Sequence, residues 1–191
     1  MRETGDDVSK IADEVSAAAA LAVELLHCKG KAGAELDFKT VRPIRTATDL
    51  SVDRNGDGKE DGHFDLWFHP ADSSLQAMDV DLNGDGKIDW KVDFDYSGGN
   101  VPQRMTIDTN MDGKADVYLP ITTSIYGRFD RIDLDGCQKL FGVSGHIDVV
   151  RTMYGSLNNF DVELKQPTRL YRKVDIMQNS DSRVAKFIYK P

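Results

Sequence analysis

Three copies of one nine-residue pattern, D-x-N-x-D-G-x-x-D, place oxygen-bearing side chains at alternate positions of the chain. The copies occupy residues 53–61, 81–89 and 108–116. Alternating carboxylate and amide oxygens followed by a glycine are what a short loop needs to wrap around one Ca²⁺, which takes about six to eight oxygen ligands. The pattern therefore predicts three calcium loops.

Each copy offers the same set of ligands. Positions 1, 3, 5 and 9 supply side-chain oxygens, whereas position 7 is always a lysine and offers only its backbone carbonyl. The expected metal ligands are Asp53, Asn55, Asp57, Lys59, Asp61, Asp81, Asn83, Asp85, Lys87, Asp89, Asp108, Asn110, Asp112, Lys114 and Asp116. The glycine at position 6 allows the sharp bend that such a loop needs.

The loops match an EF-hand only in their first half. An EF-hand has a bidentate Glu at position 12, where this chain has Phe64, Val92 or Leu119, so we expect the Asp at position 9 to close each site. The alternative is a tight Asx/Gly turn that binds no metal. Three complete copies favour calcium, because an empty loop would crowd three carboxylates without a counter-charge.

Apolar and polar residues alternate on both sides of each loop, which predicts a β-hairpin with one apolar face. Turn signals at residues 70–73 and 97–100 separate the copies. The copies begin at residues 53, 81 and 108, a spacing that holds two strands, one calcium loop and one return turn. We therefore expect an antiparallel β-meander with all three loops at one end, about 10 Å apart.

The loop pattern resembles the calcium loops of FG-GAP and VCBS repeats, and also the Asp-rich loops of thrombospondin type 3 repeats. The resemblance covers residues 47–121 and implies that the residues named above ligate Ca²⁺. An FG-GAP blade has four strands and about twice this spacing, so a propeller is not expected. The partners of those families do not carry over.

The regions outside the loops complete the expected fold. Residues 6–28 form one apolar stripe at helical spacing, and Gly30 and Gly33 would end the helix. A helix packed on the sheet is favoured over a partner-binding amphipathic helix. The sequence thus predicts a mainly β, α+β single domain over residues 1–191, with the helix at 6–28, the three hairpin repeats at 47–121 and a strand-rich part at 122–191.

A fourth, degenerate loop surrounds Asp133 and Asp135. If Asp135 is position 5, then Arg131 and Lys139 occupy positions 1 and 9, where ligands are needed. We therefore expect this segment to be an ordinary turn.

Net charge and cysteine content limit the possible binding partners and cellular locations of the protein. The net charge is −8, and three bound Ca²⁺ would reduce its magnitude. The sequence has no basic patch with interleaved aromatic residues, which argues against nucleic-acid binding.

The N-terminal helix is too short for a membrane span, and its acidic beginning does not suit a signal peptide. Cys28 and Cys137 predict one disulfide in an exported protein; the alternative is two buried thiols in a cytosolic one.

Calcium loops of this kind are expected where calcium is abundant, so we expect a secreted, periplasmic or cell-surface protein whose signal peptide has been removed. No catalytic motif is present, and His63 and His69, on one face of one strand, are expected to be solvated. The sequence favours a non-enzymatic calcium-stabilised module that binds a surface protein or glycan. The alternatives are a secreted hydrolase or enzyme inhibitor with structural calcium and, less favoured, a calcium buffer or sensor.

Overall fold

The computed structural model describes residues 5–29, 37–44, 47–55, 57–153, 157–167, 170–178 and 184–189. The first elements are α1 (Gly5–His27), β1 (Asp37–Ile44), β2 (Ala47–Asp53), β3 (Gly62–Phe68), β4 (Leu75–Asp81), β5 (Trp90–Asp95), β6 (Arg104–Asp108) and β7 (Val117–Thr123). The remaining elements are β8 (Phe129–Asp133), η1 (Asp135–Cys137), α2 (Gln138–Phe141), β9 (Ser144–Arg151), β10 (Leu157–Gln166), β11 (Leu170–Gln178) and β12 (Val184–Tyr189).

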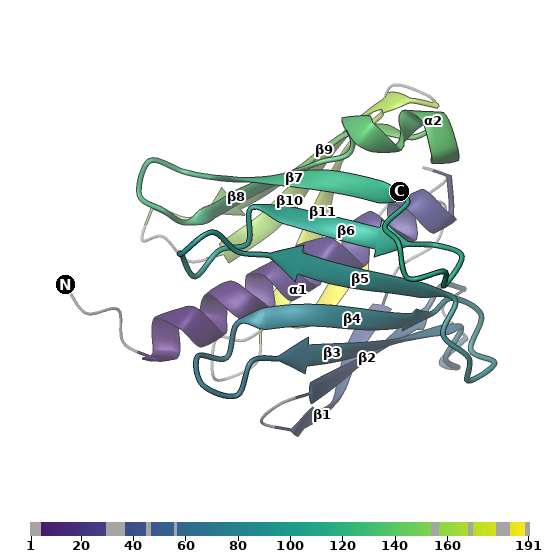
Figure 1. Cartoon of the computed structure of the whole chain (residues 1–191), viewed down its shortest axis with the longest axis horizontal. Coiled ribbons are helices and arrows are strands. Elements are labelled where there is room, and N and C mark those ends of the chain that lie inside the picture. Colours follow the sequence, from purple (N-terminus) through teal and green to yellow (C-terminus); the bar gives the residue numbers. More distant parts are fainter. Residues whose placement is uncertain are drawn as a thin grey trace.

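All described strands belong to one antiparallel sheet in which each strand pairs with its neighbours in sequence. The prediction of a mainly β protein with an antiparallel meander and one N-terminal helix is confirmed. The meander also closes on itself, because β1 pairs with β12 through Asp37 and Ile188. The twelve strands therefore form a closed barrel (Figure 1).

Helix α1 runs inside this barrel, whereas the sequence predicted a helix packed on the sheet. Its backbone contacts β4, β8 and β12, which are spaced evenly around the ring, and Figure 1 shows it between the front strands and those behind. Every side chain from Val15 to Leu26 is buried. The single-stripe interpretation was wrong because four consecutive alanines, Ala17–Ala20, make the helix narrow enough to be enclosed on all sides. A twelve-stranded ring leaves an interior too wide for its own side chains, and the helix fills it.

The helix ends where its last backbone groups are satisfied locally. The Cys28 N–H donates to the Glu24 carbonyl at 2.9 Å, and the Lys29 N–H donates to the Leu26 carbonyl at 3.1 Å. Lys29 itself takes a left-handed conformation with φ of 51°. Gly30 and Gly33, which were expected to end the helix, lie outside the described residues.

The hairpins β2–β3, β4–β5 and β6–β7 carry the three repeat loops, all at the right-hand end of the barrel in Figure 1. The period-2 prediction is confirmed for the flanking strands. The apolar residues on both sides of the loops are all buried: Leu50, Val52, Phe64, Leu66, Met78, Val80, Val92, Phe94, Met105, Ile107, Leu119 and Ile121. Each loop is therefore anchored on the core by the strands that enter and leave it.

The cysteines are free thiols, so the expected disulfide is absent. The Cys28 Sγ lies 4.0 Å from Glu24 Oε2 at the end of α1, whereas Cys137 is buried in η1. Burial, with a smaller contribution from Asp133, raises the pKa of Cys137 to about 12. The positions of the two cysteines in the sequence do not show that their thiols lie in different parts of the fold, one at the end of α1 and one in η1.

The degenerate loop was expected to be an ordinary turn, but the structure has two short helices there, η1 and α2. Asp133 Oδ1 accepts the Asp135 N–H at 2.7 Å, and Asp135 Oδ1 accepts the Gly145 N–H at 3.0 Å. Lys165 Nζ lies 2.7 Å from Asp135 Oδ2. A lysine thus pairs with the carboxylate that a metal ion would need.

Candidate metal centre

The three repeat loops share one set of hydrogen bonds. The N–H at position 6 donates to the carboxylate at position 1, over 2.7 Å for Gly58 to Asp53, 2.7 Å for Gly86 to Asp81 and 2.8 Å for Gly113 to Asp108. The N–H at position 2 donates to the carboxylate at position 9, over 2.8 Å for Arg54 to Asp61, 2.8 Å for Leu82 to Asp89 and 3.0 Å for Thr109 to Asp116. The two outer carboxylates therefore hold the loop closed from opposite sides.

The middle of each loop repeats as well. The side-chain oxygen at position 3 accepts the N–H of position 5, and that of position 5 accepts the N–H of position 7. These bonds are Asp57 to Asn55, Lys59 to Asp57, Asp85 to Asn83, Lys87 to Asp85, Asp112 to Asn110 and Lys114 to Asp112, all 2.8–2.9 Å. Each of these bonds is an Asx turn, in which an Asn or Asp side chain accepts a hydrogen bond from the backbone two residues further on.

The backbone conformation explains the glycine at position 6. Gly58, Gly86 and Gly113 have φ of 84°, 80° and 83°, a left-handed region that side chains rarely adopt. No neighbouring atom would lie within 4 Å of a Cβ at these glycines, so the requirement is conformational rather than steric. The same conformation in three loops indicates that the repeat is structural and not only a sequence pattern.

The carboxylate at position 1 is the most enclosed of the predicted ligands in each loop. Asp53, Asp81 and Asp108 are buried, whereas the side chains at positions 3 and 5 are exposed. Burial would raise the pKa of Asp81, but the N–H groups of Gly86, Asn83 and Gly84 outweigh it and hold this pKa below its usual value. The carboxylate of Asp81 is therefore ionised at neutral pH, as a calcium ligand must be.

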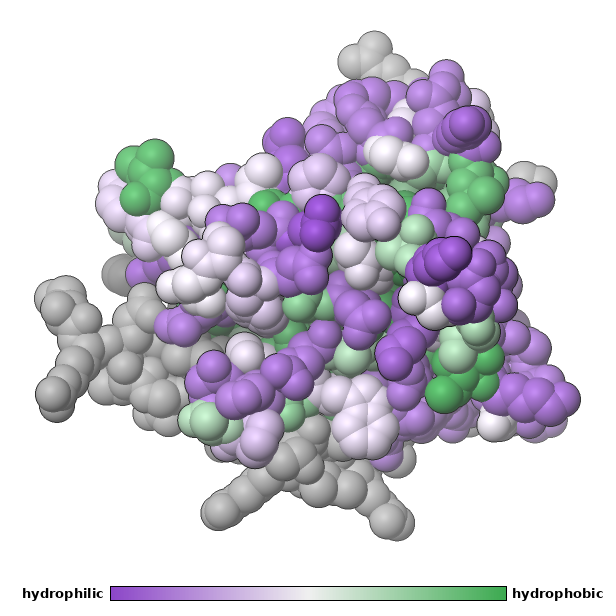
Figure 2. Space-filling view, viewed as in Figure 1, coloured by the Kyte–Doolittle hydropathy of each residue, from purple (hydrophilic) through white to green (hydrophobic). Residues whose placement is uncertain are grey.

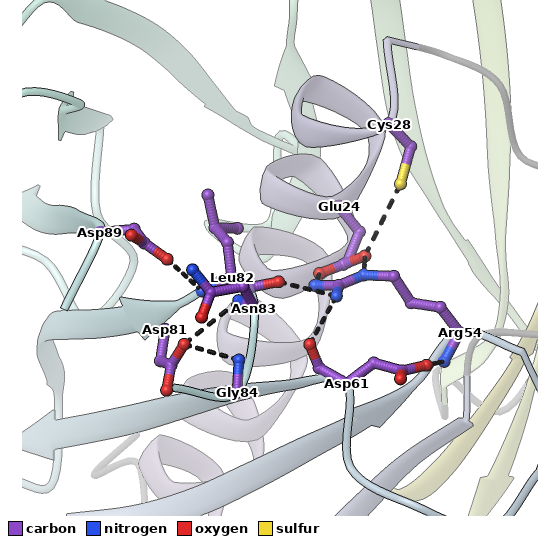
Figure 3. A network of polar contacts seen from close by, with 9 residues as sticks. All are labelled: Glu24, Cys28, Arg54, Asp61, Asp81, Leu82, Asn83, Gly84 and Asp89. Atoms are coloured by element: carbon purple, nitrogen blue, oxygen red, sulfur yellow. Dashed lines mark hydrogen bonds and ion pairs between the residues drawn. The ribbon is translucent and has the colours of Figure 1, made fainter. Parts of the chain in front are cut away.

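The first loop is also tied to the interior helix, through the residue at its variable second position. Arg54 reaches into the barrel and makes two hydrogen bonds, of 2.8 and 2.7 Å, with the fully buried carboxylate of Glu24 (Figure 3). Its Nη1 donates to the carbonyls of Asp61 at 2.8 Å and Leu82 at 2.7 Å. One guanidinium thus joins α1, the first loop and the second loop.

Gly62 makes room for this contact. A Cβ there would lie 2.7 Å from Arg54 Nη2 and 3.0 Å from the Asp81 carbonyl oxygen. Burial opposes the charge of Arg54, but Glu24 outweighs it through a hydrogen bond and its own charge, and the pKa of Arg54 is raised. The guanidinium of Arg54 therefore stays charged where it meets Glu24, at the loop-bearing end of the barrel.

The loop carboxylates do not converge as tightly as a separate cluster on the outer face. In the described part of the chain, one group of three His, Cys, Asp or Glu has ligand atoms that all lie within 4.8 Å of one another. It consists of Asp49, His63 and Asp65, none of which belongs to the repeat pattern. In the loops, the carboxylates at positions 1, 5 and 9 bond the loop backbone instead.

The sequence analysis assigned His63 to a solvated strand face and did not predict Asp49 or Asp65 as metal ligands. The signal that reveals the cluster is strand register, because Asp49 lies directly opposite Asp65 in the β2–β3 pair. His63 precedes Asp65 by two residues and therefore shares its face. This register follows from the hairpin geometry of the first loop and was not evident from composition.

A small pocket adjoins this cluster and the second loop. Its volume is about 220 Å³, and its lining comprises Glu60, His63, Asp65, Asp79, Asp81, Gly84, Gly86, Lys87 and Ile88. Asp65 also lies directly opposite Asp79 in the β3–β4 pair. Four of the nine lining residues are thus acidic, and one is a lysine.

No known protein family matches the chain, and no curated protein is detectably similar to it. The resemblance to FG-GAP, VCBS and thrombospondin type 3 loops therefore concerns the loop pattern alone. Within the described residues, α1 and the other helices are not long and apolar enough to cross a membrane.

Proposed function

We propose that the three hairpin loops each bind one Ca²⁺ and that the ions stabilise the barrel end. The observation that carries this proposal is the shared set of hydrogen bonds in the three loops, together with the repeated left-handed glycine at position 6. The atoms available as metal ligands are hard oxygens, which suit Ca²⁺ better than a transition-metal ion. Side chains at positions 3 and 5 are exposed, and each accepts one backbone hydrogen bond through Oδ1.

Native mass spectrometry and calorimetry test this proposal, with three Ca²⁺ per chain as the expected stoichiometry. Asp85→Ala removes a ligand from the second loop and should lower the stoichiometry by one. Asp72→Ala is the matched control, since Asp72 makes an Asx turn with Ser74 in the β3–β4 turn, outside the repeat pattern. Fewer than two ions in the wild-type protein, or an equal loss in both variants, would contradict it.

We place the protein outside the cytoplasm, in a secreted, periplasmic or cell-surface location. Calcium modules that work in extracellular fluid have Kd values of about 10⁻⁴–10⁻³ M, and such sites fill only where calcium is abundant. The partner that we favour is a glycan on a surface rather than a protein. The support for this choice lies on the outer face of β3–β7.

Two exposed aromatic rings lie in one row across these strands. Trp67 and Tyr118 are 48% and 52% exposed, and the register places Ala77, Asp93 and Thr106 between them. Four strand spacings separate the rings by roughly 19 Å. The face around them is mainly hydrophilic in Figure 2. Two flat rings with the polar side chains of Asp93 and Thr106 between them suit sugars, which combine apolar C–H faces with hydroxyls.

The two rings are held in place by polar neighbours. The Trp67 Nε1–H donates to Asp79 Oδ2 at 3.0 Å, and the Arg104 guanidinium lies 5.3 Å from the centre of the Tyr118 ring. A ring that is fixed before binding loses less conformational entropy when it stacks on a sugar. This arrangement favours a binding platform over scattered surface aromatics.

Binding to a panel of neutral and acidic polysaccharides in millimolar Ca²⁺ tests the glycan proposal. Trp67→Ala and Tyr118→Ala should each weaken binding about 10-fold or more, equivalent to a loss of roughly 1.4 kcal/mol. Tyr126→Ala is the control, because Tyr126 is 81% exposed but lies in the β7–β8 turn, away from the row. No polysaccharide binding, or equal binding by all variants, would exclude this face as a glycan site.

A further inference from the structure

The outer face of β2 and β3 carries a group of ligands that the calcium loops do not use. Asp49 and Asp65 face each other across the two strands, and His63 shares their side of β3. One ligand atom from each of the three residues lies within 4.8 Å of the others. All three are partly buried, so each side chain has limited freedom to leave the cluster.

A further carboxylate fixes the imidazole of His63. Its Nδ1 lies 2.6 Å from Glu60 Oε1, and its Nε2 lies 3.0 Å from Asp65 Oδ1. Metal-binding histidines usually donate one ring N–H to a carboxylate, which fixes the tautomer and leaves the other nitrogen for the metal. Glu60 is in the position to do this, and Nε2 is the nitrogen that lies beside Asp65.

The local charge also favours a cation. Asp49, Asp65 and Asp79 are directly opposite one another on three successive strands, a like-charge arrangement that opposes strand pairing. A divalent ion between the carboxylates would relieve this repulsion more fully than the one imidazole.

We propose that Asp49, His63 and Asp65 bind a first-row divalent transition-metal ion at a site distinct from the three calcium loops. One imidazole with two carboxylates suits Zn²⁺, Mn²⁺ or Fe²⁺, whereas Ca²⁺ takes oxygen ligands. Three protein ligands leave a coordination position free. The pocket of about 220 Å³ that His63 and Asp65 line provides room there for water or a small ligand.

Calorimetric titration of the full chain with Zn²⁺, in saturating Ca²⁺, tests the proposal. The calcium present keeps the loops occupied, so their carboxylates do not compete for zinc. We expect one Zn²⁺ per chain. His63→Gln and Asp65→Asn should each weaken this binding at least 100-fold, whereas Glu60→Gln, which removes only the support of the imidazole, should weaken it about 10-fold.

His69→Gln is the matched control. His69 is a partly buried histidine, like His63, and lies 3.3 Å from the carboxylate of Asp72, but it lies just after β3 at the other end of the barrel. This variant should bind Zn²⁺ as the wild type does. Ring-nitrogen NMR of the wild type should show the Nε2 signal of His63 shifting on Zn²⁺ addition, while Nδ1 stays protonated.

Three outcomes would overturn the proposal. They are the absence of saturable Zn²⁺ binding to the wild type, unchanged binding in His63→Gln, and an equal loss in His63→Gln and His69→Gln. Calcium stoichiometry measured on the same variants separates this site from the calcium proposal, because none of the substituted residues is a loop ligand. It also shows whether each variant is folded.

Discussion

At the scale of single residues, Arg54 has the most consequential position. It fills the second place of the first loop, where the other loops have Leu82 and Thr109. Leu82 is buried, and the Thr109 hydroxyl donates to Asp116 Oδ2 at 2.7 Å. The same variable position thus links one loop to the helix, packs the second on the core and closes the third.

Glu24→Gln should both destabilise the protein and weaken its calcium affinity. Removing one partner of a buried ion pair costs about 3–5 kcal/mol, because the remaining charge stays buried without compensation. Arg54 would then shift, and its Nη1 would no longer fix the carbonyls of Asp61 and Leu82. Denaturant unfolding in EDTA measures the first effect, and calcium titration measures the second.

Glu14→Gln is the control for this prediction. Glu14 also joins α1 to the barrel, through bonds of 2.8 and 2.6 Å to Arg151, but its partner lies on β9 and not on a calcium loop. This variant should lose stability and keep its calcium affinity. Equal calcium affinity in Glu24→Gln and the wild type would show that Arg54 does not couple the helix to the loops.

Candidate site residues were predictable where they follow one another along the chain, and not where they come from different strands. Asp81, Asn83 and Asp85 belong to a local repeat and share its hydrogen bonds, and their role as calcium ligands stays a prediction. Asp49 and His63 are brought together only by the register of two strands. The pairing of Glu24 with Arg54 spans 30 residues and depends on the helix being inside the barrel.

At the scale of elements, the hairpins were predictable, whereas the closure of the sheet into a barrel was not. Period-2 alternation beside each loop determines which residues face the core, and burial of Phe64, Val92 and Leu119 agrees with it. No comparable local signal shows that β1 pairs with β12, since these strands are distant in sequence. The predicted helix was enclosed rather than one-sided because its small residues, Ala17–Ala20, fit a narrow space that periodicity does not describe.

At the scale of the whole molecule, the two barrel ends differ in chemistry. One end carries the three acidic loops, and the other carries exposed apolar residues at two hairpin tips. Ile125 and Met153 are 92% and 89% exposed, and Figure 2 shows a hydrophobic tip at the upper left, where the β7–β8 hairpin lies in Figure 1. If the acidic loops bind calcium as proposed, the stability of the barrel depends on the calcium concentration.

Calcium should therefore raise the melting temperature of the entire domain. Each loop joins two strands whose inward residues belong to the common core, so an ion that fixes the loop stabilises the strands as well. At a concentration of 100 times Kd, one site that binds only the folded chain adds about 2.7 kcal/mol, and three independent sites add about 8 kcal/mol. For a chain of this size, 1 kcal/mol corresponds to a shift of about 2–4 °C.

Thermal unfolding in EDTA should thus occur roughly 15–30 °C below that in excess Ca²⁺. Re-addition of Ca²⁺ should restore the higher temperature, whereas Mg²⁺ should do so poorly, because it requires a tighter octahedron and loses its waters reluctantly. Asp85→Ala should show a smaller calcium effect than the wild type, since one of the three loops has lost a ligand. Identical unfolding curves in EDTA and in millimolar Ca²⁺ would mean that the loops are ordinary turns, held only by the hydrogen bonds of their own carboxylates.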